Sequence, residues 1–477
     1  MRVKWIVLAL IACMVLLAGA PALGAKGGVK KPPTDEEPPP PATVPDFYFW
    51  KLGHMDGPHD SSKALGISRD EKVAVGQTVV VEFLKAWRMD IDWALSTDDQ
   101  IPPLYNELQV QESIGGEAAY AASNMTTLTC GYDKVALNLD WCGSFPVGTL
   151  TTGTVSYAAE WLWAYDAEAT EPNYIAIPDF GGGISDMVAN DVTTDGLIFV
   201  GTGNVKTGPV AFRADTQVLD VDLVPIPKQL TIMDLTTLQT LQTSSAQAVS
   251  ADGLIIAGFG GTATGNKAFV TTVLDATADP ILLESYILPA IAGGKWSEAY
   301  AMTPDGLYIA GRSDSPKGPQ ACIWFQGDDP LTPELETWVV KDLGGLSKRK
   351  YNSVATGIVQ RPGAADGELL VVGSSQSILY PSEAFVWSGN PVLGENVMDL
   401  GVPGYLYDLE YILIKTGAGE ASAMGSSWIL NEATGIALNA DLTARIVGWG
   451  VNPEGGIEAW LVAEFPLDAI EPLFTHE

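Results

Sequence analysis

The sequence predicts an all-β fold, a seven-bladed β-propeller, from a repeat, its turns and the two ends of the repeat array. A short motif recurs seven times: an apolar strand, a tight turn, a second strand ending in Gly, then Ala and an aromatic residue. One such unit cannot bury its own faces, so the copies must pack against each other. Sheets repeated in this way can close into a ring that leaves only short edges.

The glycine that closes the second strand gives each repeat an anchor. The anchors are Gly76, Gly131, Gly201, Gly258, Gly311, Gly373 and Gly448. Their spacing of 53 to 75 residues fits units of three or four strands better than helical repeats. The apolar runs between turn residues, such as 254–257 and 369–372, are typical of short strands.

Four of the turns are Asp-Gly pairs, at 195–196, 252–253, 305–306 and 366–367. Asp-Gly accepts the positive φ angles of a tight hairpin. Three repeats depart from the pattern: one has Asp70-Glu71, one has Asp441-Leu442, and the second repeat has no such pair. The aspartates could also be metal ligands, but turn chemistry explains them without a metal.

An Ala-aromatic signature follows each turn, as in Ala86-Trp87, Ala268-Phe269 and Ala459-Trp460. One aromatic per unit suits sheets packed face to face, so we expect these rings in the core. Rings at the rim could instead stack on a ligand.

The ends of the array predict how the ring closes. The last repeat stops after one strand following its hairpin, at 458–465, and an orphan strand-like segment, 46–50, precedes the first repeat. If that segment supplies the outer strand of the last blade, hydrogen bonds between the two ends latch the ring. An open β-solenoid is the alternative.

The repeat also resembles a known family. The pattern Ser-Ala-x-Ala-x-Ser-x-Asp-Gly followed by Glu-Ala-Phe-x-Trp is similar to the bacterial extracellular repeat of the HAF type, here with Lys267-Ala268-Phe269 and Glu383-Ala384-Phe385. The His of the family motif is absent from every copy. The resemblance implies an exported, propeller-like bacterial protein and carries over no catalytic residues.

The N-terminal segment predicts export. Arg2 and Lys4 precede an apolar run at 5–20, and small residues follow at 22 and 24, so residues 1–24 read as a secretory signal peptide. A retained membrane anchor and a lipid attached at Cys13 are alternatives. Residues 25–45 form a Pro-rich linker, 46–467 the repeat domain and 468–477 a C-terminal tail. We expect a secreted or cell-surface monomer with no membrane span after cleavage.

The formal net charge of −32 limits the partners. Such a surface repels nucleic acid and anionic membranes. It suits solubility, cation accumulation, or contact with neutral or cationic polymers.

Export permits a disulfide between Cys130 and Cys142, which lie within one repeat. Cys322 stands where other repeats have Phe or Trp, so we expect it to be a small buried hydrophobic residue.

One cluster has the composition of a metal site: His54, Asp56, His59 and Asp60. Imidazoles and carboxylates so close in sequence could hold a divalent transition metal. The glycines and proline among them equally suit a polar loop. Ca²⁺ bound by paired carboxylates is also possible, but no cofactor is required.

Two insertions carry aromatic residues of the kind that stack on sugars: Trp141, Phe145 and Tyr157 in one, and Tyr405, Tyr407 and Tyr411 in the other. Long loops on a rigid scaffold often carry recognition. Ordinary loop packing is the alternative.

The sequence has no Gly-x-Ser-x-Gly elbow and no phosphate loop. Its only histidines are His54, His59 and His476, so a Ser-His-Asp triad would have to use one of them. We therefore expect a non-enzymatic binding or surface-interaction module whose ligand is a polysaccharide or a protein. An extracellular polysaccharide hydrolase or lyase and a structural matrix component are the alternatives.

Overall fold

The computed structural model describes residues 48–53, 61–80, 83–91, 106–107, 118–122, 146–152, 155–162, 173–176, 184–218, 225–233, 235, 238, 241–278, 281–328, 336–347, 352–361, 368–391, 405–416, 428–438 and 443–466. All of them belong to one compact unit, Pro45–Glu477.

The described strands form seven four-stranded antiparallel sheets. The first holds β2 (Ser61–Ile67), β3 (Val73–Val80), β4 (Phe83–Asp90) and β5 (Asn106–Glu107), and the second β6 (Ala118–Ala122), β7 (Pro146–Thr152), β8 (Val155–Leu162) and β9 (Asn173–Ala176). The third holds β10 (Ser185–Val192), β11 (Ile198–Val205), β12 (Gly208–Val218) and β13 (Pro225–Ile232), and the fourth β14 (Thr243–Val249), β15 (Ile255–Thr262), β16 (Gly265–Asp275) and β17 (Leu282–Ile287).

The fifth sheet holds β18 (Ser297–Met302), β19 (Tyr308–Ser313), β20 (Gln320–Asp328) and β21 (Glu336–Gly344). The sixth holds β22 (Ser353–Gln360), β23 (Leu369–Ser375), β24 (Glu383–Gly389) and β25 (Tyr405–Asp408). The seventh holds β26 (Ile429–Leu438), β27 (Thr443–Val451), β28 (Ile457–Pro466) and β1 (Tyr48–Gly53).

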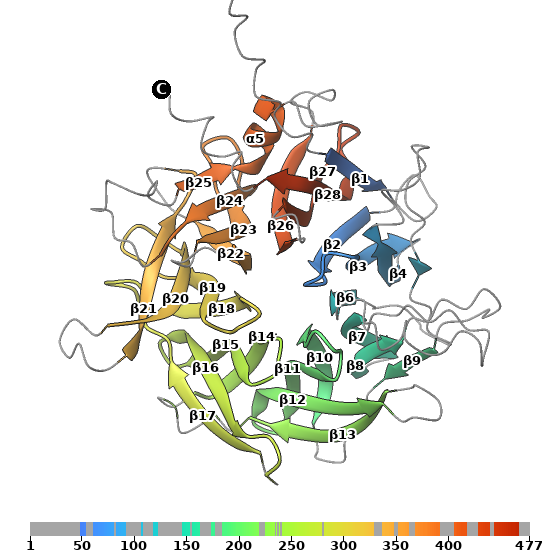
Figure 1. Cartoon of the computed structure of the whole chain (residues 1–477), viewed down its shortest axis with the longest axis vertical. Coiled ribbons are helices and arrows are strands. Elements are labelled where there is room, and N and C mark those ends of the chain that lie inside the picture. The colour runs from blue at the N-terminus through green and yellow to red at the C-terminus, as the bar shows by residue number, and fades with distance from the viewer. Residues whose placement is uncertain are drawn as a thin grey trace, which may run out of the picture. The chain divides into compact units, whose positions relative to one another are not determined.

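The sheets follow one another around a ring, with the first strand of each sheet at the centre (Figure 1). Each central strand contacts the central strands of the sheets before and after it, and β26 contacts β2, which closes the ring. This arrangement is a β-propeller, so the predicted all-β propeller is confirmed.

The two ends of the array meet in the seventh sheet, as the sequence predicted. β1 pairs antiparallel with β28, and Phe49 lies opposite Val462. Phe49 is buried against Trp428 and Trp460, at ring-centroid distances of 5.3 and 6.4 Å. Hydrogen bonds and buried rings therefore join the N-terminal strand to the last hairpin.

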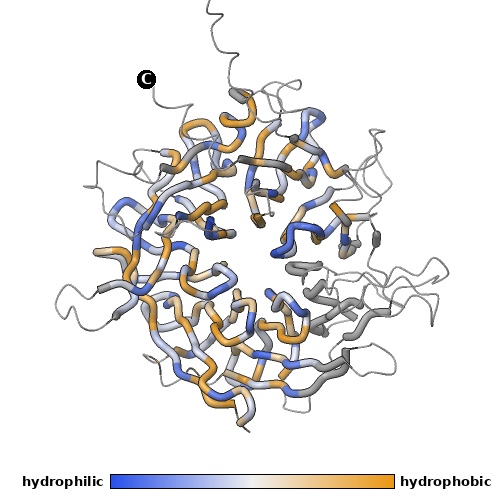
Figure 2. The backbone as a smooth tube through the Cα atoms, viewed as in Figure 1, coloured by the Kyte–Doolittle hydropathy of each residue, from blue (hydrophilic) through white to orange (hydrophobic). Residues whose placement is uncertain are grey.

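The core lies between the sheets. Buried and partly exposed residues alternate along central strands such as β2 and β14, and apolar and polar residues alternate in Figure 2. The repeated aromatic residues are fully buried, as expected of core rings: Trp87, Phe212, Phe269, Phe385 and Trp460. Cys322 takes the same position, pairs with Gly311 and is buried, which confirms its predicted packing role.

A β-bulge explains why each second strand needs its glycine. In every described sheet an Ala of the central strand lies opposite that glycine, and the register shifts directly after the Ala. The shift turns the preceding carbonyl over the glycine. A Cβ on Gly201 would lie 1.9 Å from the carbonyl oxygen of Val188, and one on Gly311 2.1 Å from that of Glu298. Only glycine fits this contact.

The second repeat corrects one sequence prediction. Gly131 lies outside the described residues, and the glycine that the register places opposite the central strand is Gly148, which pairs with Ala119. Its partner on the third strand is Ala159, where most repeats have an aromatic residue. Because this repeat lacks both the Asp-Gly turn and the aromatic, nothing in the sequence marked Gly148 as the anchor.

The Asp-Gly turns are held by hydrogen bonds within the turn. In the fourth sheet Ser250 Oγ donates to Asp252 Oδ1 at 2.6 Å, the amide of Leu254 donates to the same oxygen at 3.0 Å, and Gly253 has φ 73°. Thr193 with Asp195 and Thr303 with Asp305 repeat this pattern. The turn interpretation is therefore confirmed for Asp195, Asp252 and Asp305, whereas the pair at 366–367 lies outside the described residues.

The insertion before the seventh repeat contains regular structure. It supplies β25 and then the helix α5 (Leu409–Thr416), whose Leu409, Ile412 and Leu413 are buried in the core. Within the described part of the chain, no helix combines the length and hydropathy that crossing a bilayer requires.

We expect Gly258→Ala to destabilise the fold by about 3 kcal/mol or more, because its Cβ would lie 2.0 Å from the backbone oxygen of Ser245. Gly455→Ala is the matched control: its φ is +85°, but a Cβ there meets nothing within 4 Å, so only about 1 kcal/mol should be lost. Urea unfolding of both variants measures the difference. Equal losses would contradict the role given to the carbonyl contact.

Candidate functional site: the central channel

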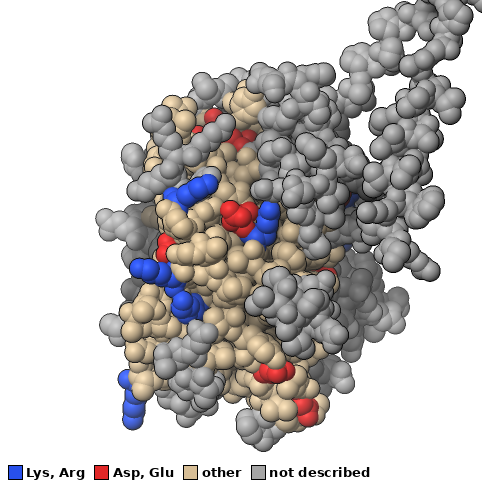
Figure 3. Space-filling view, turned by 90° about the vertical axis from the view of Figure 1, so that its left-hand side faces the viewer, with Lys and Arg blue, Asp and Glu red and all other residues tan. Residues whose placement is uncertain are grey.

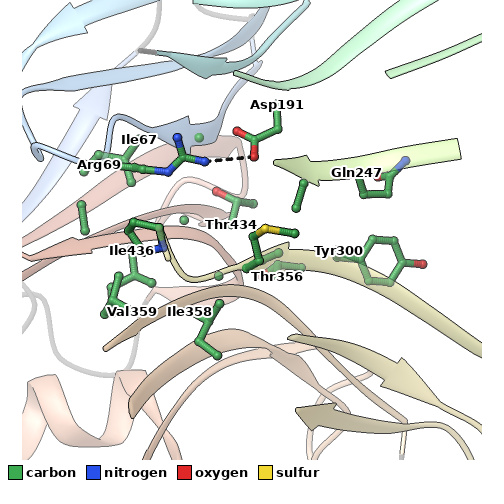
Figure 4. Close-up of a pocket in the computed structure, with 18 of the residues that line it drawn as sticks. Ile67, Arg69, Asp191, Gln247, Tyr300, Thr356, Ile358, Val359, Thr434 and Ile436 are labelled. Atoms are coloured by element: carbon green, nitrogen blue, oxygen red, sulfur yellow. Dashed lines mark hydrogen bonds and ion pairs between the residues drawn. The ribbon is translucent and has the colours of Figure 1, made fainter. Parts of the chain in front are cut away.

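A cavity of about 710 Å³ runs between the central strands. Its described lining comes from β2, β10, β14, β18, β22 and β26 and from the turns that follow some of them (Figure 4). We call this cavity the channel. Its volume falls in the range typical of small-ligand sites.

In six of the described central strands the bulge places one extra residue beside the channel. These residues are Leu65, Asn190, Gln247, Tyr300, Thr356 and Thr434.

Three of them bind the neighbouring sheet. Asn190 Nδ2 donates to the carbonyl of Ala246 at 2.7 Å, Thr356 Oγ1 to that of Ala433 at 2.5 Å, and Thr434 Oγ1 to that of Ala64 at 2.9 Å. The same bond thus joins successive sheets at three places.

Gln247 and Tyr300 bond within their own sheets instead. Gln247 Nε2 donates to Ser245 Oγ at 2.6 Å, and Tyr300 OH donates to Glu298 Oε2 at 2.5 Å. Gln247 belongs to the fourth sheet and Tyr300 to the adjacent fifth sheet. The lining therefore differs chemically from one side of the channel to the other.

Arg69 crosses the channel where the first turns lie. It sits in the β2–β3 turn of the first sheet, yet its guanidinium donates to the carbonyl of Val192 at 2.9 Å and to that of Val249 at 2.6 Å. It also pairs with Asp191 at 3.3 Å (Figure 4). One side chain thus ties the first sheet to the third and fourth and partly closes this end of the channel.

Asp191 occupies a position that is Gly or Ala in the other described central strands, for example Ala248 and Gly435. A Cβ on Gly435 would already lie 3.1 Å from Ile67 of the next sheet, so the position faces a close neighbour. Asp191 forms a hydrogen bond with the next sheet at this position, because the amide of Val249 donates to its Oδ2 at 2.8 Å. Burial raises the pKa of Asp191, and the attraction of Arg69 opposes that shift.

A second cluster surrounds Glu298, near the start of β18, two residues before Tyr300 of the channel lining. Tyr300 OH, Arg312 Nε and Asn266 Nδ2 all donate to this carboxylate. Burial alone would raise the pKa of Glu298, but the bonds from Tyr300, Asn266 and Arg312 outweigh it and the pKa lies below its ordinary value.

Aromatic rings surround this cluster. Phe259 of the fourth sheet meets Tyr300 at a centroid distance of 5.8 Å, and the Arg312 guanidinium lies 5.3 Å from the centroid of Trp296. We call Phe259, Trp296, Tyr300 and Arg312 the aromatic rim. Trp296 directly precedes β18, whereas Arg69 follows β2, so the rim lies at the end away from Arg69.

A related group joins the seventh and first sheets. Trp449 follows its strand glycine as Phe259 and Arg312 follow theirs, so it lies at the same level of the ring. Lys63 Nζ lies 3.9 Å from its ring centroid, and its Nε1 donates to Glu432 at 3.1 Å. Partly exposed aromatic rings therefore occur on two sides of the same mouth.

The predicted metal ligands, His54, Asp56, His59 and Asp60, lie outside the described residues, as do Cys130 and Cys142. Among the residues that are described, no group of three His, Cys, Asp or Glu side chains is placed to hold a metal ion. The metal site, the Ca²⁺ site and the disulfide stay predictions.

Some of the predicted ligand-binding aromatic residues lie on described strands and others lie outside the described residues. Trp141 and Phe145 lie outside the described residues. Tyr157 lies on β8, and Tyr405 and Tyr407 lie on β25, so these three belong to sheet strands rather than to the loops expected. Their role in binding stays a prediction.

Three carboxylates gather beside α5. Asp408 caps the helix by accepting the amide of Tyr411 at 3.2 Å, and Glu410 accepts the amide of Leu430 at 3.4 Å. Burial, reinforced by Asp408 and Glu383, raises the pKa of Glu410 to about 7. Burial and the neighbouring carboxylates therefore disfavour the ionised form of Glu410 at neutral pH.

Sequence reasoning missed the rim and Arg69. Phe259 and Arg312 directly follow the glycine of their second strand, and Tyr300 directly follows Ala299, so the signal available was the residue type at these variable positions. Arg69 replaces the Thr, Ala or Pro of other turns, but no local pattern reveals a partner more than 100 residues away.

No family model and no curated protein matches the chain, so the resemblance to HAF-type repeats stays a prediction. Among solved structures, TolB from Acinetobacter baumannii matches at a TM-score of 0.33 and 12% identity, over 83% of this chain and 81% of that one. Prolyl oligopeptidase B from Galerina marginata matches at 0.37 and 9%, over 81% and 46%. Similarities this weak carry no conclusion about function, and the fold rests on the ring of sheets.

We expect Arg69→Ala to cost about 2–4 kcal/mol, because it leaves Asp191 and two strand-end carbonyls without their donor. Asp191→Ala restores the residue type of Ala248, so the double variant should lose at least about 1 kcal/mol less than the sum of the single losses. Urea unfolding of all four proteins gives the cycle. Additive losses would show that the pair is not coupled.

We expect Glu410→Gln to stabilise the protein at pH 8 by roughly 1 kcal/mol and to change little at pH 4.5. A carboxyl whose pKa is raised on folding favours the folded state at low pH, and this contribution is lost as the pH rises from 4.5 to about 7. The Gln side chain keeps the acceptor for Leu430. Thermal melts from pH 4 to 8 check this, and a pH-independent gain would refute the charge explanation.

Proposed function

We propose that this chain is an exported, non-enzymatic binding module, a seven-bladed propeller whose ligand is an extracellular polysaccharide. The observation that supports this most is the aromatic rim at one mouth of the channel. Trp296, Tyr300 and Phe259 come from adjacent sheets and lie beside hydrogen-bonding side chains. Aromatic faces with fixed polar groups nearby are what a sugar ring requires.

The charged groups of the channel favour binding over catalysis. Glu298 accepts three side-chain hydrogen bonds, and Asp191 accepts two backbone amides in addition to its Arg69 contact. All of these bonds join the carboxylates to groups of the fold itself, which favours a structural role for them over proton transfer.

The location and the other partners follow from the sequence. A signal peptide at 1–24 would direct export, and the net charge of −32 disfavours nucleic acid and anionic membranes. A surface protein as ligand, in place of a polysaccharide, also fits a channel mouth of this kind.

One observation keeps an enzyme as a second candidate. His54, Asp56, His59 and Asp60 lie within seven residues and have the composition of a metal-assisted hydrolase or lyase centre. This candidate requires a divalent metal held by those side chains.

The test is retention of the mature domain on a panel of immobilised polysaccharides, with analysis of the supernatant by mass spectrometry. We expect retention without new oligosaccharides, and a loss of affinity of about tenfold or more in Trp296→Ala, because a stacking ring is removed. Tyr286→Ala is the matched control, since this exposed tyrosine lies on the outer strand β17.

Two results would overturn the proposal. New oligosaccharides that vanish in a His54→Ala, His59→Ala double variant would establish the enzyme instead. Retention unaffected by Trp296→Ala, or no retention on any polysaccharide, would remove the rim as a saccharide site and leave a protein ligand.

A further inference from the structure

The aromatic rim contains a guanidinium fixed from three directions. Arg312 Nε pairs with Glu298 Oε2 at 2.6 Å, and its Cζ lies 5.3 Å from the ring centroid of Trp296 and 5.8 Å from that of Tyr300. Glu298 is itself held by Asn266 of the neighbouring sheet. The side chain of Arg312 is nevertheless 35% exposed, so a ligand can reach it.

The backbone at Trp296 is also held in place. Its carbonyl accepts the amide of Asp314 at 2.9 Å and the hydroxyl of Ser313 at 3.2 Å. Gly265 packs against it, since a Cβ on that glycine would lie 3.0 Å from the Cβ of Trp296. These contacts hold the backbone of Trp296, and its indole lies beside the bound guanidinium, so little rearrangement is needed before a ligand binds.

The local charge at this place is positive, although the chain as a whole is acidic. Lys267 Nζ donates to the carbonyl of Lys295 at 2.6 Å, which brings its ammonium next to Trp296 in the chain. Glu298 is neutralised by its pair with Arg312. Lys267 and Lys295 add two positive charges beside it, and Asp314, whose Oδ2 accepts the amide of Lys295 at 3.1 Å, offsets one of them. On the side of the molecule that Figure 3 shows, the Lys and Arg side chains are scattered over a mostly uncharged described surface, and Asp or Glu side chains lie beside some of them.

We propose that the aromatic rim binds the uronic acid units of an acidic polysaccharide, with Trp296 against the sugar ring and Arg312 on its carboxylate. This inference rests on the proposed function and names the ligand class of the same site. A guanidinium held at Nε still offers the planar pair of terminal nitrogens that fits a carboxylate. A neutral sugar has no carboxylate to place against those terminal nitrogens.

The overall charge of −32 does not oppose this assignment at physiological salt. Charges separated by more than about 8 Å are largely screened there, so the nearby Arg312 and Lys267 dominate over distant carboxylates. At low salt the repulsion reaches further. Uronate binding by this protein should therefore weaken, rather than strengthen, when the salt concentration falls well below the physiological value.

The experiment is calorimetric titration of the mature domain with an oligogalacturonate and with a neutral malto-oligosaccharide of equal length. We expect tighter binding of the oligogalacturonate. Arg312→Gln should weaken it about tenfold or more, since a charge-assisted bond is lost, and should change the affinity for the neutral sugar less than about twofold.

Further variants separate binding from folding. Glu298→Gln combined with Arg312→Gln removes the ligand contact without leaving a buried carboxylate alone, and it should lose uronate affinity to the same extent. Lys267→Gln, which leaves the Glu298 cluster intact, should weaken uronate binding about two- to fivefold. Lys206→Gln, an exposed lysine in the β11–β12 turn, is the control and should have no effect.

The outcomes distinguish this inference from the proposed function. Equal affinity for the two sugars, or uronate binding unaffected by the Arg312 and Lys267 variants, would overturn the uronate assignment and leave a polysaccharide-binding module. Binding of neither sugar, to a domain shown to be folded by its thermal melt, would overturn both.

Discussion

The contact between a bulged carbonyl and a glycine is the constraint on which the rest of this propeller depends. In each described sheet the central strand shifts register after an Ala, and the freed carbonyl presses onto the glycine of the second strand. That glycine in turn lies beneath the third-strand aromatic: a Cβ on Gly448 would lie 2.4 Å from the indole of Trp460. Ala, Gly and the aromatic are thus one packing unit spread over three strands.

The same bulge builds the channel. By adding one residue to the central strand, it places a side chain beside the channel in six of the described sheets. Where that residue is Thr or Asn, it bonds to the next sheet and strengthens the ring. Where it is Gln247 or Tyr300, the bond stays within the sheet, and the neighbouring aromatic rim occurs on that same side. The same β-bulge therefore positions side chains that join the sheets and side chains that lie beside the proposed binding site.

The sequence was sufficient for the features that repeat. The Asp-Gly turns, the buried aromatic positions, the substitution of Cys322 and the pairing of β1 with β28 were all predictable, because each is set by local chemistry or by a count of strands. The anchor of the second repeat was misplaced at Gly131 because its sheet lacks the two markers that identify Gly148. Arg69, Arg312 and Trp296 could not be found, because their roles depend on residues that only the closed ring brings together.

The link made by Arg69 passes over the second sheet, since it joins the first sheet directly to the third and fourth. The ring is therefore supported across the position where the sequence repeat is weakest. If the second sheet opened locally, these contacts would still join the first sheet to the third and fourth. For protein engineering, the second sheet is accordingly the place to graft a foreign domain or a new binding loop onto this scaffold.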